Sequence, residues 1–202
     1  MNHINDIKNP VKKILFLGYD ENQTQLIQAL VKKNCLVDHT NEKIDDICGY
    51  DFVVSYGYQH ILKKRVIEGF GCPIFNLHIS YLPYNRGAHP NFWSFYDNTP
   101  SGVTIHLIDE GIDTGFIVSQ KYVNFKEDED TFAKTYTVLI NEIESLFMYC
   151  INSLLSGNWV AKKQRSVGTH HYAKNLPSNF SGWNSNIKQE IEKLDNEGLK
   201  YE

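Results

Sequence analysis

The 202-residue chain has only four cysteines, and no two of them form a Cys-x-x-Cys pair. Cys35, Cys48, Cys72 and Cys150 lie far apart along the chain. Disulfide frameworks and thiolate zinc sites are recognised by close, regular cysteine spacing. The sequence therefore predicts reduced, largely buried thiols and no metal site.

The sequence also lacks a basic excess and long apolar runs. Lys and Arg number 20 against 24 Asp and Glu, which gives a formal net charge of -4. Nucleic-acid-binding proteins usually carry a basic excess, so we expect no nucleic-acid partner. Residues 1–10 are polar, and no stretch approaches the roughly 18 apolar residues of a membrane span. We therefore expect a cytoplasmic protein with no membrane partner.

Short apolar runs alternate with helical patterns in the first half of the chain. The runs occupy residues 13–18, 35–39, 51–56 and 73–78. Two segments with apolar residues at helical spacing, 23–33 and 62–69, lie between them. This alternation predicts an α/β fold with an open, largely parallel twisted sheet flanked by helices.

The second half has a different pattern. Residues 102–109 and 116–124 alternate like two strands, and residues 131–156 carry one apolar stripe typical of a long helix. Asp130 is the expected N-cap of this helix, and Gly157 the residue that ends it. We expect one core over residues 1–160. Residues 161–202 are polar, and we expect a short irregular extension with a helix near 187–194 that packs on the core or on a second subunit.

Three polar residues stand at positions that favour chemistry. Asn76 and His78 are two residues apart at the end of a predicted strand, so their side chains share one face. In open α/β sheets, ligands bind beyond the carboxyl ends of the strands. Asp113 lies in a loop between Gly111 and Gly115. The alternatives are a strand-end Asn that caps a turn and an Asp that forms an Asx turn.

Two stretches carry a family resemblance: FNLHISYLPYNRG at residues 75–87 and HLIDEGIDTGFIVSQ at residues 106–120. They resemble the folate-dependent formyltransferases, whose motif is Asn-x-His, then Leu-Pro and a glycine, then an Asp-x-Gly loop ahead of Ile-x-Gln. Ile79 departs from the proline that many members carry after the histidine. The resemblance implies a Rossmann-like formyltransferase fold, with residues 1–160 as the catalytic domain.

The resemblance also implies roles for these three residues in formyl transfer. Asn76 donates an amide hydrogen to the formyl oxygen as negative charge develops there. His78 accepts the proton of the attacking amine, and Asp113 orients His78 and an ordered water. No metal is needed.

By the same resemblance, the co-substrate 10-formyltetrahydrofolate binds between two segments. The residues expected to line its site are Gln59, His60, Ile61, Leu62, Ile108, Asp109, Glu110 and Asp113. Main-chain groups near His60 and Leu62 are expected to pair with the pterin edge.

The formyl acceptor is expected on the segment that follows His78. Its sequence is most similar to the sugar N-formyltransferases, transferases that act on dTDP- or GDP-linked 4-amino-4,6-dideoxyhexoses or on 3-amino sugars. Such a nucleotide sugar serves surface polysaccharide synthesis, such as that of lipopolysaccharide O-antigen, and members of this type are commonly homodimers. The expected acceptor-binding residues are Tyr84, Arg86, His89, Asn91 and Trp93.

Each of these residues has an expected contact. Arg86 offers a fork for a diphosphate, and Trp93 a stacking surface. Tyr84, His89 and Asn91 offer hydrogen bonds for sugar hydroxyls. The structural alternatives are a clamp on the loop at 83–90 for Arg86 and a place in the core for Trp93.

Other acceptors and one other class of function remain open. Glycinamide ribonucleotide transformylases have a Gly-x-Gly-Ser-Asn turn that grips phosphate, where this chain has Leu17-Gly18-Tyr19-Asp20-Glu21-Asn22. Methionyl-tRNA formyltransferases carry a further C-terminal barrel and a basic surface, and we expect neither here. A non-catalytic folate- or nucleotide-binding module has no need for the proton-transfer set of Asn76, His78 and Asp113.

Overall fold

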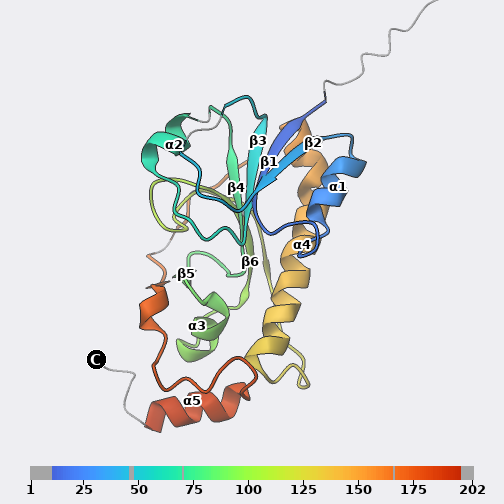
Figure 1. Cartoon of the computed structure of the whole chain (residues 1–202). Coiled ribbons are helices and arrows are strands. Elements are labelled where there is room, and N and C mark those ends of the chain that lie inside the picture. The colour runs from blue at the N-terminus through green and yellow to red at the C-terminus, as the bar shows by residue number, and fades with distance from the viewer. Residues whose placement is uncertain (1–10, 46–47, 70, 166, 197–202) are drawn as a thin grey trace, which may run out of the picture.

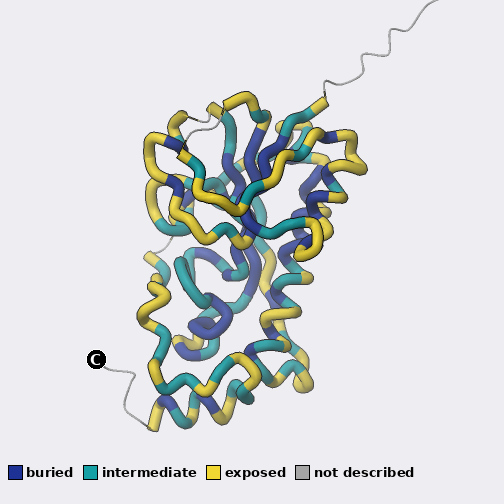
Figure 2. The backbone as a smooth tube through the Cα atoms, viewed as in Figure 1, coloured by how far each residue is buried: buried dark blue, intermediate teal, exposed yellow. Residues whose placement is uncertain are grey.

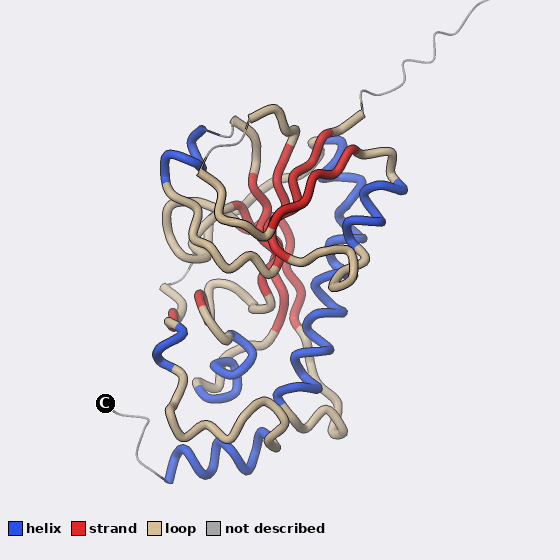
Figure 3. Tube along the Cα trace, viewed as in Figure 1, coloured by secondary structure: helices blue, strands red, loops and turns tan. Residues whose placement is uncertain are grey.

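The computed structural model describes residues 11–45, 48–69, 71–165 and 167–196. Its main sheet has six strands in the order β2-β1-β3-β4-β6-β7. The strands are β1 (Lys13–Gly18), β2 (Leu36–Thr40), β3 (Phe52–Tyr56), β4 (Ile74–His78), β6 (Gly102–Leu107) and β7 (Ile117–Tyr122). The first four in this order are parallel, whereas β6 and β7 join antiparallel. The predicted open, largely parallel sheet is confirmed (Figure 3).

Helices cover both faces of this sheet. Figure 1 shows α1 (Leu26–Lys32) and α4 (Phe132–Ser156) on one side and α2 (Lys64–Gly69) on the other. Alternate residues of β1 serve the two faces: Ile14 and Phe16 pack with α1 and α4, while Leu15 and Leu17 join the core beneath α2. This double burial explains why the strand is a continuous apolar run, and the central strands are accordingly dark blue in Figure 2.

The long helix α4 begins at Phe132, one residue later than predicted. Thr131, not Asp130, is the N-cap: it has extended backbone angles, and its side chain accepts a hydrogen bond from the Lys134 main-chain nitrogen. Asp130 instead forms an ion pair with Lys134 at 2.9 Å. Gly157 ends the helix with a left-handed φ of 76°, as predicted. By length and composition α4 could cross a membrane, but core helices of soluble proteins pass the same test, and its apolar stripe packs on the sheet.

The C-terminal residues pack on the core. We call residues 162–165 and 167–172 the C-terminal strap. Within it, β8 (His170–His171) pairs with β5 (Arg86–Gly87), a short strand in the segment predicted to be a loop. Farther along, α5 (Ile187–Asn196) packs against α3 (Pro90–Tyr96), with Leu194 among the buried aromatic side chains there. The division of the chain near residue 160 remains a prediction.

The N-cap assignment leads to a stability prediction. Thr131→Ala should lower the free energy of unfolding by about 1 kcal/mol, because one main-chain N–H of the first turn loses its acceptor. Urea denaturation followed by circular dichroism measures this change. Thr137→Ala, an exposed mid-helix site of the same chemistry, is the matched control. Equal stability of the two variants would contradict the assignment.

Candidate active site

The candidate site lies at the carboxyl ends of the parallel strands. From β1 the chain passes through α1 to β2 on one side, and β3 then adds on the other side, so the order reverses between β1 and β3. Open α/β sheets bind ligands at such a reversal. Tyr56 ends β3 at this point and His78 ends the neighbouring β4.

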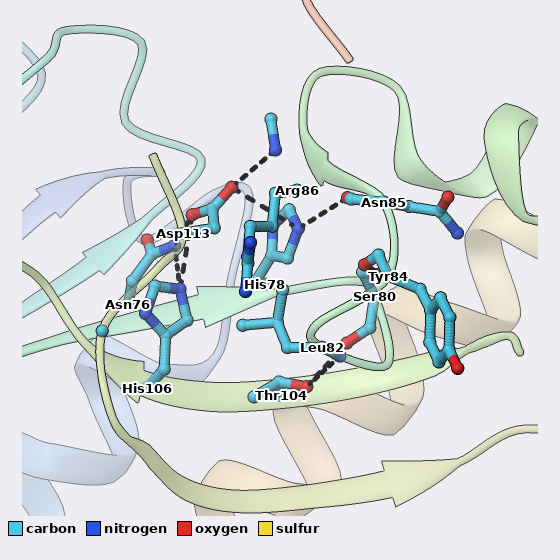
Figure 4. A network of polar contacts seen from close by, with 12 residues as sticks. Asn76, His78, Ser80, Leu82, Tyr84, Asn85, Arg86, Thr104, His106 and Asp113 are labelled. Carbon is cyan, nitrogen blue, oxygen red and sulfur yellow. Dashed lines mark hydrogen bonds and ion pairs between the residues drawn. The ribbon is translucent and has the colours of Figure 1, made fainter. Parts of the chain in front are cut away.

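The structure brings together the three residues expected to react. Asn76 Nδ2 donates to Asp113 Oδ1 at 3.2 Å, and His78 Nε2 lies 3.6 Å from Asp113 Oδ2 (Figure 4). The His78 and Asp113 side chains are only 10% and 14% exposed. Two groups from β4 therefore meet one carboxylate from the loop between β6 and β7.

The loop that carries Asp113 is held from within and from outside. Asp109 Oδ1 accepts hydrogen bonds from the Gly111 main chain at 3.1 Å and from Thr114 Oγ1 at 2.6 Å. A side chain at Gly115 would lie 1.7 Å from the Leu107 carbonyl oxygen, so only glycine fits there. From the facing loop, the Gly87 main-chain N–H donates to Asp113 Oδ2 at 2.8 Å.

His106 is a fourth member of this cluster, and the sequence reasoning missed its role. Its Nε2 lies 3.3 Å from Asp113 Oδ1 and 3.1 Å from Asn76 Nδ2. Its Nδ1 lies 2.8 Å from the Leu107 carbonyl oxygen. A carbonyl can only accept, so Nδ1 carries a hydrogen. The available signal was strand pairing, because His106 lies opposite Asn76 on the antiparallel neighbour.

Burial sets the protonation of His78. It lowers the pKa of His78, an effect that the Asp113 carboxylate partly opposes. The Asn85 carbonyl oxygen lies 3.2 Å from His78 Nε2, so this nitrogen carries the hydrogen, and Nδ1, which has no hydrogen-bond partner among the described residues, is the acceptor. At neutral pH the ring is therefore neutral and able to take up a proton.

Asp113 is ionised for a different reason. Burial raises its pKa, but the two histidines and the Gly87 N–H lower it by more, and the net pKa is well below the ordinary value. At neutral pH the cluster thus combines His78 as a neutral base with Asp113 as an ionised carboxylate. Among the described residues, no group of three or more His, Cys, Asp or Glu side chains could hold a metal ion.

Two hollows meet at this cluster. The larger, of about 450 Å³, is the loop cavity; Gln59, His60, Ile61, Leu62, Ile108, Asp109, Glu110 and Asp113 are among its lining residues. The structure therefore gathers the residues expected to bind the co-substrate. The smaller, of about 240 Å³, is the tyrosine cavity, lined among others by Tyr19, Tyr56, Tyr58 and Tyr136. Asn76 and Asp113 line both cavities, so the two cavities adjoin at these residues.

The residues expected to bind the acceptor lie elsewhere. Tyr84, Arg86, His89, Asn91 and Trp93 are absent from the described residues that line either cavity. Tyr84 points away from Asp113 in Figure 4, and the His89 ring contacts Trp183.

The side chains of Arg86, Asn91 and Trp93 already have partners within the protein, and their role in acceptor binding stays a prediction. The Arg86 guanidinium donates to Gln164 Oε1 and to the Val167 carbonyl oxygen, which matches the clamp alternative. Asn91 is 3% exposed, and its amide bonds the Phe132 carbonyl and the Thr135 hydroxyl. Trp93 is 5% exposed and stacks on His171 with ring centroids 3.9 Å apart.

Comparison with known proteins places this geometry in context. Residues 12–149 match the family model described as formyl transferase. The chain is 30% identical over 127 residues to a dTDP-4-amino-4,6-dideoxyglucose formyltransferase of Mycobacterium bovis, covering 63% of this chain and 53% of that protein. It is 33% identical over 141 residues to a methionyl-tRNA formyltransferase of Clostridium acetobutylicum, covering 69% and 45%. The chain thus spans about half the length of these curated relatives.

A solved structure matches over nearly its full length. The formyltransferase PseJ from Anoxybacillus kamchatkensis, in complex with UDP-4,6-dideoxy-4-formamido-L-AltNAc and tetrahydrofolate, superposes with a TM-score of 0.82. The two chains are 38% identical, and the match covers 90% of this chain and 98% of that one.

The lowered pKa of His78 predicts a pH effect on stability. Below about pH 6.5 the unfolded chain gains a proton on this residue that the folded protein excludes, so acidification favours unfolding, by at most about 1.4 kcal/mol per pH unit for one proton. His78→Gln should flatten the pH dependence of the unfolding free energy below about pH 6.5, because the pKa of His78 is lowered in the folded protein. Asp113 contributes in a lower window, since its depressed pKa places its loss of stabilisation below about pH 4.

Urea denaturation across this pH range measures the effect. His60→Gln, at an exposed position, is the control. A pH profile for His78→Gln that parallels the unsubstituted protein would show that His78 does not carry the effect.

Proposed function

This chain belongs to the formyl transferase family, and we propose that it transfers the formyl group of 10-formyltetrahydrofolate to the amine of a nucleotide-linked 4-amino-4,6-dideoxyhexose. One observation carries the proposal: Asn76 and Asp113 stand where two cavities adjoin, with the buried His78 beside them. A transferase must bring donor and acceptor to one proton-transfer group from two sides.

The loop cavity suits the folate. Among the described residues, main-chain groups of residues 59–62 form no hydrogen bond within the protein, so they are free to pair with a pterin edge. Leu62, Ile108 and Ile112 supply apolar walls. When bound, 10-formyltetrahydrofolate supplies the formyl group.

The residues of the chain divide the chemistry among them. Asn76 Nδ2 donates to the oxygen on which negative charge develops, in place of its bond to His106. His78 takes the amine proton at Nδ1, and the Asp113 carboxylate stabilises the resulting imidazolium. The imidazolium then returns a proton to the folate nitrogen as the bond between that nitrogen and the formyl carbon breaks, so His78 ends neutral. Proton transfer of this kind contributes roughly 10²–10⁴-fold to rate.

The tyrosine cavity is the proposed acceptor site. It is smaller than the roughly 300–1,000 Å³ of pockets that enclose drug-sized ligands, so we expect it to hold the amino sugar while the nucleotide lies outside. Tyr19 and Tyr136 hydroxyls lie 3.1 Å apart on its wall. The Tyr56 hydroxyl is buried without a hydrogen-bond partner among the described residues, and a polar substituent of a sugar would satisfy it.

Two relatives support the choice of sugar. PseJ was solved with a UDP-linked 4-formamido-4,6-dideoxy sugar, and the M. bovis relative is named for a dTDP-linked 4-amino-4,6-dideoxy sugar. Both sugars are linked to a pyrimidine nucleotide. We place UDP first, because the PseJ match extends over almost all of both chains. GDP, which the sequence left open, has no support from either protein.

The proposal extends to the setting of the reaction. We propose that the product serves surface polysaccharide synthesis, such as that of O-antigen, and that the protein acts as a cytoplasmic homodimer. These points rest on the resemblance to sugar N-formyltransferases. Light scattering of the purified protein measures its mass in solution and thereby tests the dimer.

The reacting residues lead to a kinetic prediction. Asn76→Ala should reduce kcat roughly 10²–10³-fold, as expected for one lost oxyanion donor. His78→Ala and Asp113→Asn should also reduce kcat strongly and leave tetrahydrofolate affinity nearly unchanged, because both act on charge that develops in the transition state. Steady-state kinetics and calorimetry measure the two quantities. Asp128→Asn, at an exposed position, is the control. Near-normal turnover in any of the three site variants would refute its assigned role.

Acceptor choice is tested with a panel. We expect formylation of UDP-linked 4-amino-4,6-dideoxy sugars first, dTDP-linked ones second and GDP-linked ones least, each detected as addition of one formyl group by mass spectrometry. The panel includes 3-amino sugar nucleotides, glycinamide ribonucleotide and methionyl-tRNA. The tRNA is included because the methionyl-tRNA formyltransferase of C. acetobutylicum is 33% identical to this chain, against 30% for the M. bovis sugar formyltransferase. Preferential formylation of the tRNA or the ribonucleotide would overturn the sugar assignment and leave formyl transfer standing.

A further inference from the structure

The side chain of Gln164 lies between Arg86 and the loop that carries Asp113. Its Nε2 donates to the Asp113 and Gly115 carbonyl oxygens, both at 2.8 Å. Its Oε1 accepts from Arg86 Nη2 at 2.6 Å and from Arg86 Nε at 3.1 Å. The oxygen and the nitrogen of this half-buried amide therefore both form hydrogen bonds within the protein.

Chemistry fixes the orientation of this amide. A guanidinium has only hydrogens to donate, and carbonyl oxygens can only accept. The amide oxygen must therefore face Arg86, and the amide nitrogen must face the loop. Neither a carboxylate nor an apolar side chain could make both sets of contacts.

Gln164 binds the loop at a residue with an uncommon backbone conformation. Asp113 has a φ of 52°, in the left-handed region that side-chain-bearing residues seldom adopt. Its own carbonyl is one of the two that Gln164 binds. The main-chain direction at this residue sets where the carboxylate points, and so sets its distance to His78.

Arg86 also joins its own segment to the C-terminal strap. Its Nη1 donates to the Val167 carbonyl oxygen at 3.0 Å, and its main-chain N–H donates to the Thr169 carbonyl oxygen at 3.0 Å. The next residue, Gly87, donates to Asp113 Oδ2. The carboxylate of Asp113 is therefore held through Gly87 while its main chain is held through Gln164.

We propose that Arg86 and Gln164, which belongs to the C-terminal strap, form a positioning pair that aims the Asp113 carboxylate at His78. The inference rests on the proposed function, since it assigns the pair an effect on formyl transfer. It also replaces a diphosphate contact as the role of Arg86. Neither residue touches the reacting atoms; both act through Asp113.

Two substitutions of Gln164 test the pair. Gln164→Glu keeps the size and the acceptor for Arg86 but sets an oxygen against the two loop carbonyls. Gln164→Leu removes the donors without adding charge. We expect both to reduce kcat roughly ten- to hundredfold, the scale of a misplaced catalytic group, with KM for folate and acceptor and the melting temperature close to those of the unsubstituted protein.

Two control variants show whether a loss of activity depends on the place of Gln164 or only on the kind of exchange. Gln189→Glu makes the same exchange at an exposed site of α5, and Val167→Ala shortens an exposed side chain of the strap while keeping the carbonyl that Arg86 binds. Both should retain full kcat. A loss of kcat in Gln164→Glu alone would show an effect of charge and overturn the inference, as would a loss of melting temperature that parallels the loss of kcat.

A second measurement does not depend on the acceptor. Amide hydrogen exchange at Gly87 reports its bond to Asp113, and it should accelerate in Gln164→Leu but not in Val167→Ala. If the unsubstituted protein formylates no acceptor of the panel, the proposed function has failed, and Gly87 exchange alone decides whether Gln164 positions Asp113. Unchanged exchange at Gly87 would overturn the inference.

Discussion

The buried carboxylate of Asp113 meets polar groups from several elements: Asn76 and His78 from β4, His106 from β6 and the Gly87 amide from the facing loop. A charge that is mostly removed from water is costly unless hydrogen bonds and opposite charge compensate it. These contacts lower the pKa of Asp113 despite its burial. The sheet, the loop and the C-terminal strap all contribute contacts to the Asp113 carboxylate or to its main chain. The position of the carboxylate therefore depends on each of them.

The sheet confines chemistry to one edge. Its central strands are apolar on both faces, because α1 and α4 cover one face and α2 the other. Polar residues that need a ligand or a proton can therefore stand only where the strands end. Asn76 and His78 stand at the end of β4, and Asp113 reaches them from a loop. The result is a group of reacting side chains at which two cavities adjoin.

The sequence predicted those parts that local patterns or the family motif specify. Apolar runs located β1 and β3, the apolar stripe located α4, and the motif located Asn76, His78, Asp113 and the segments that line the loop cavity. It did not predict partners that are remote in the chain. Arg86 is held by Gln164, Asn91 by the start of α4 and Trp93 by His171, contacts between remote parts of the chain that no local pattern shows. His106 was missed because its role depends on which strand pairs with β4.

The central claim is that donor and acceptor meet at these side chains from the two cavities. A crystal structure of the protein with tetrahydrofolate and a UDP-linked 4-amino-4,6-dideoxy sugar tests it most directly. We predict the pterin in the loop cavity against residues 59–62, and the sugar amine in the tyrosine cavity beside Tyr19 and Tyr136, with Asn76, His78 and Asp113 between them. Folate and sugar bound on the same side of Asn76, or a sugar amine remote from His78, would contradict the account.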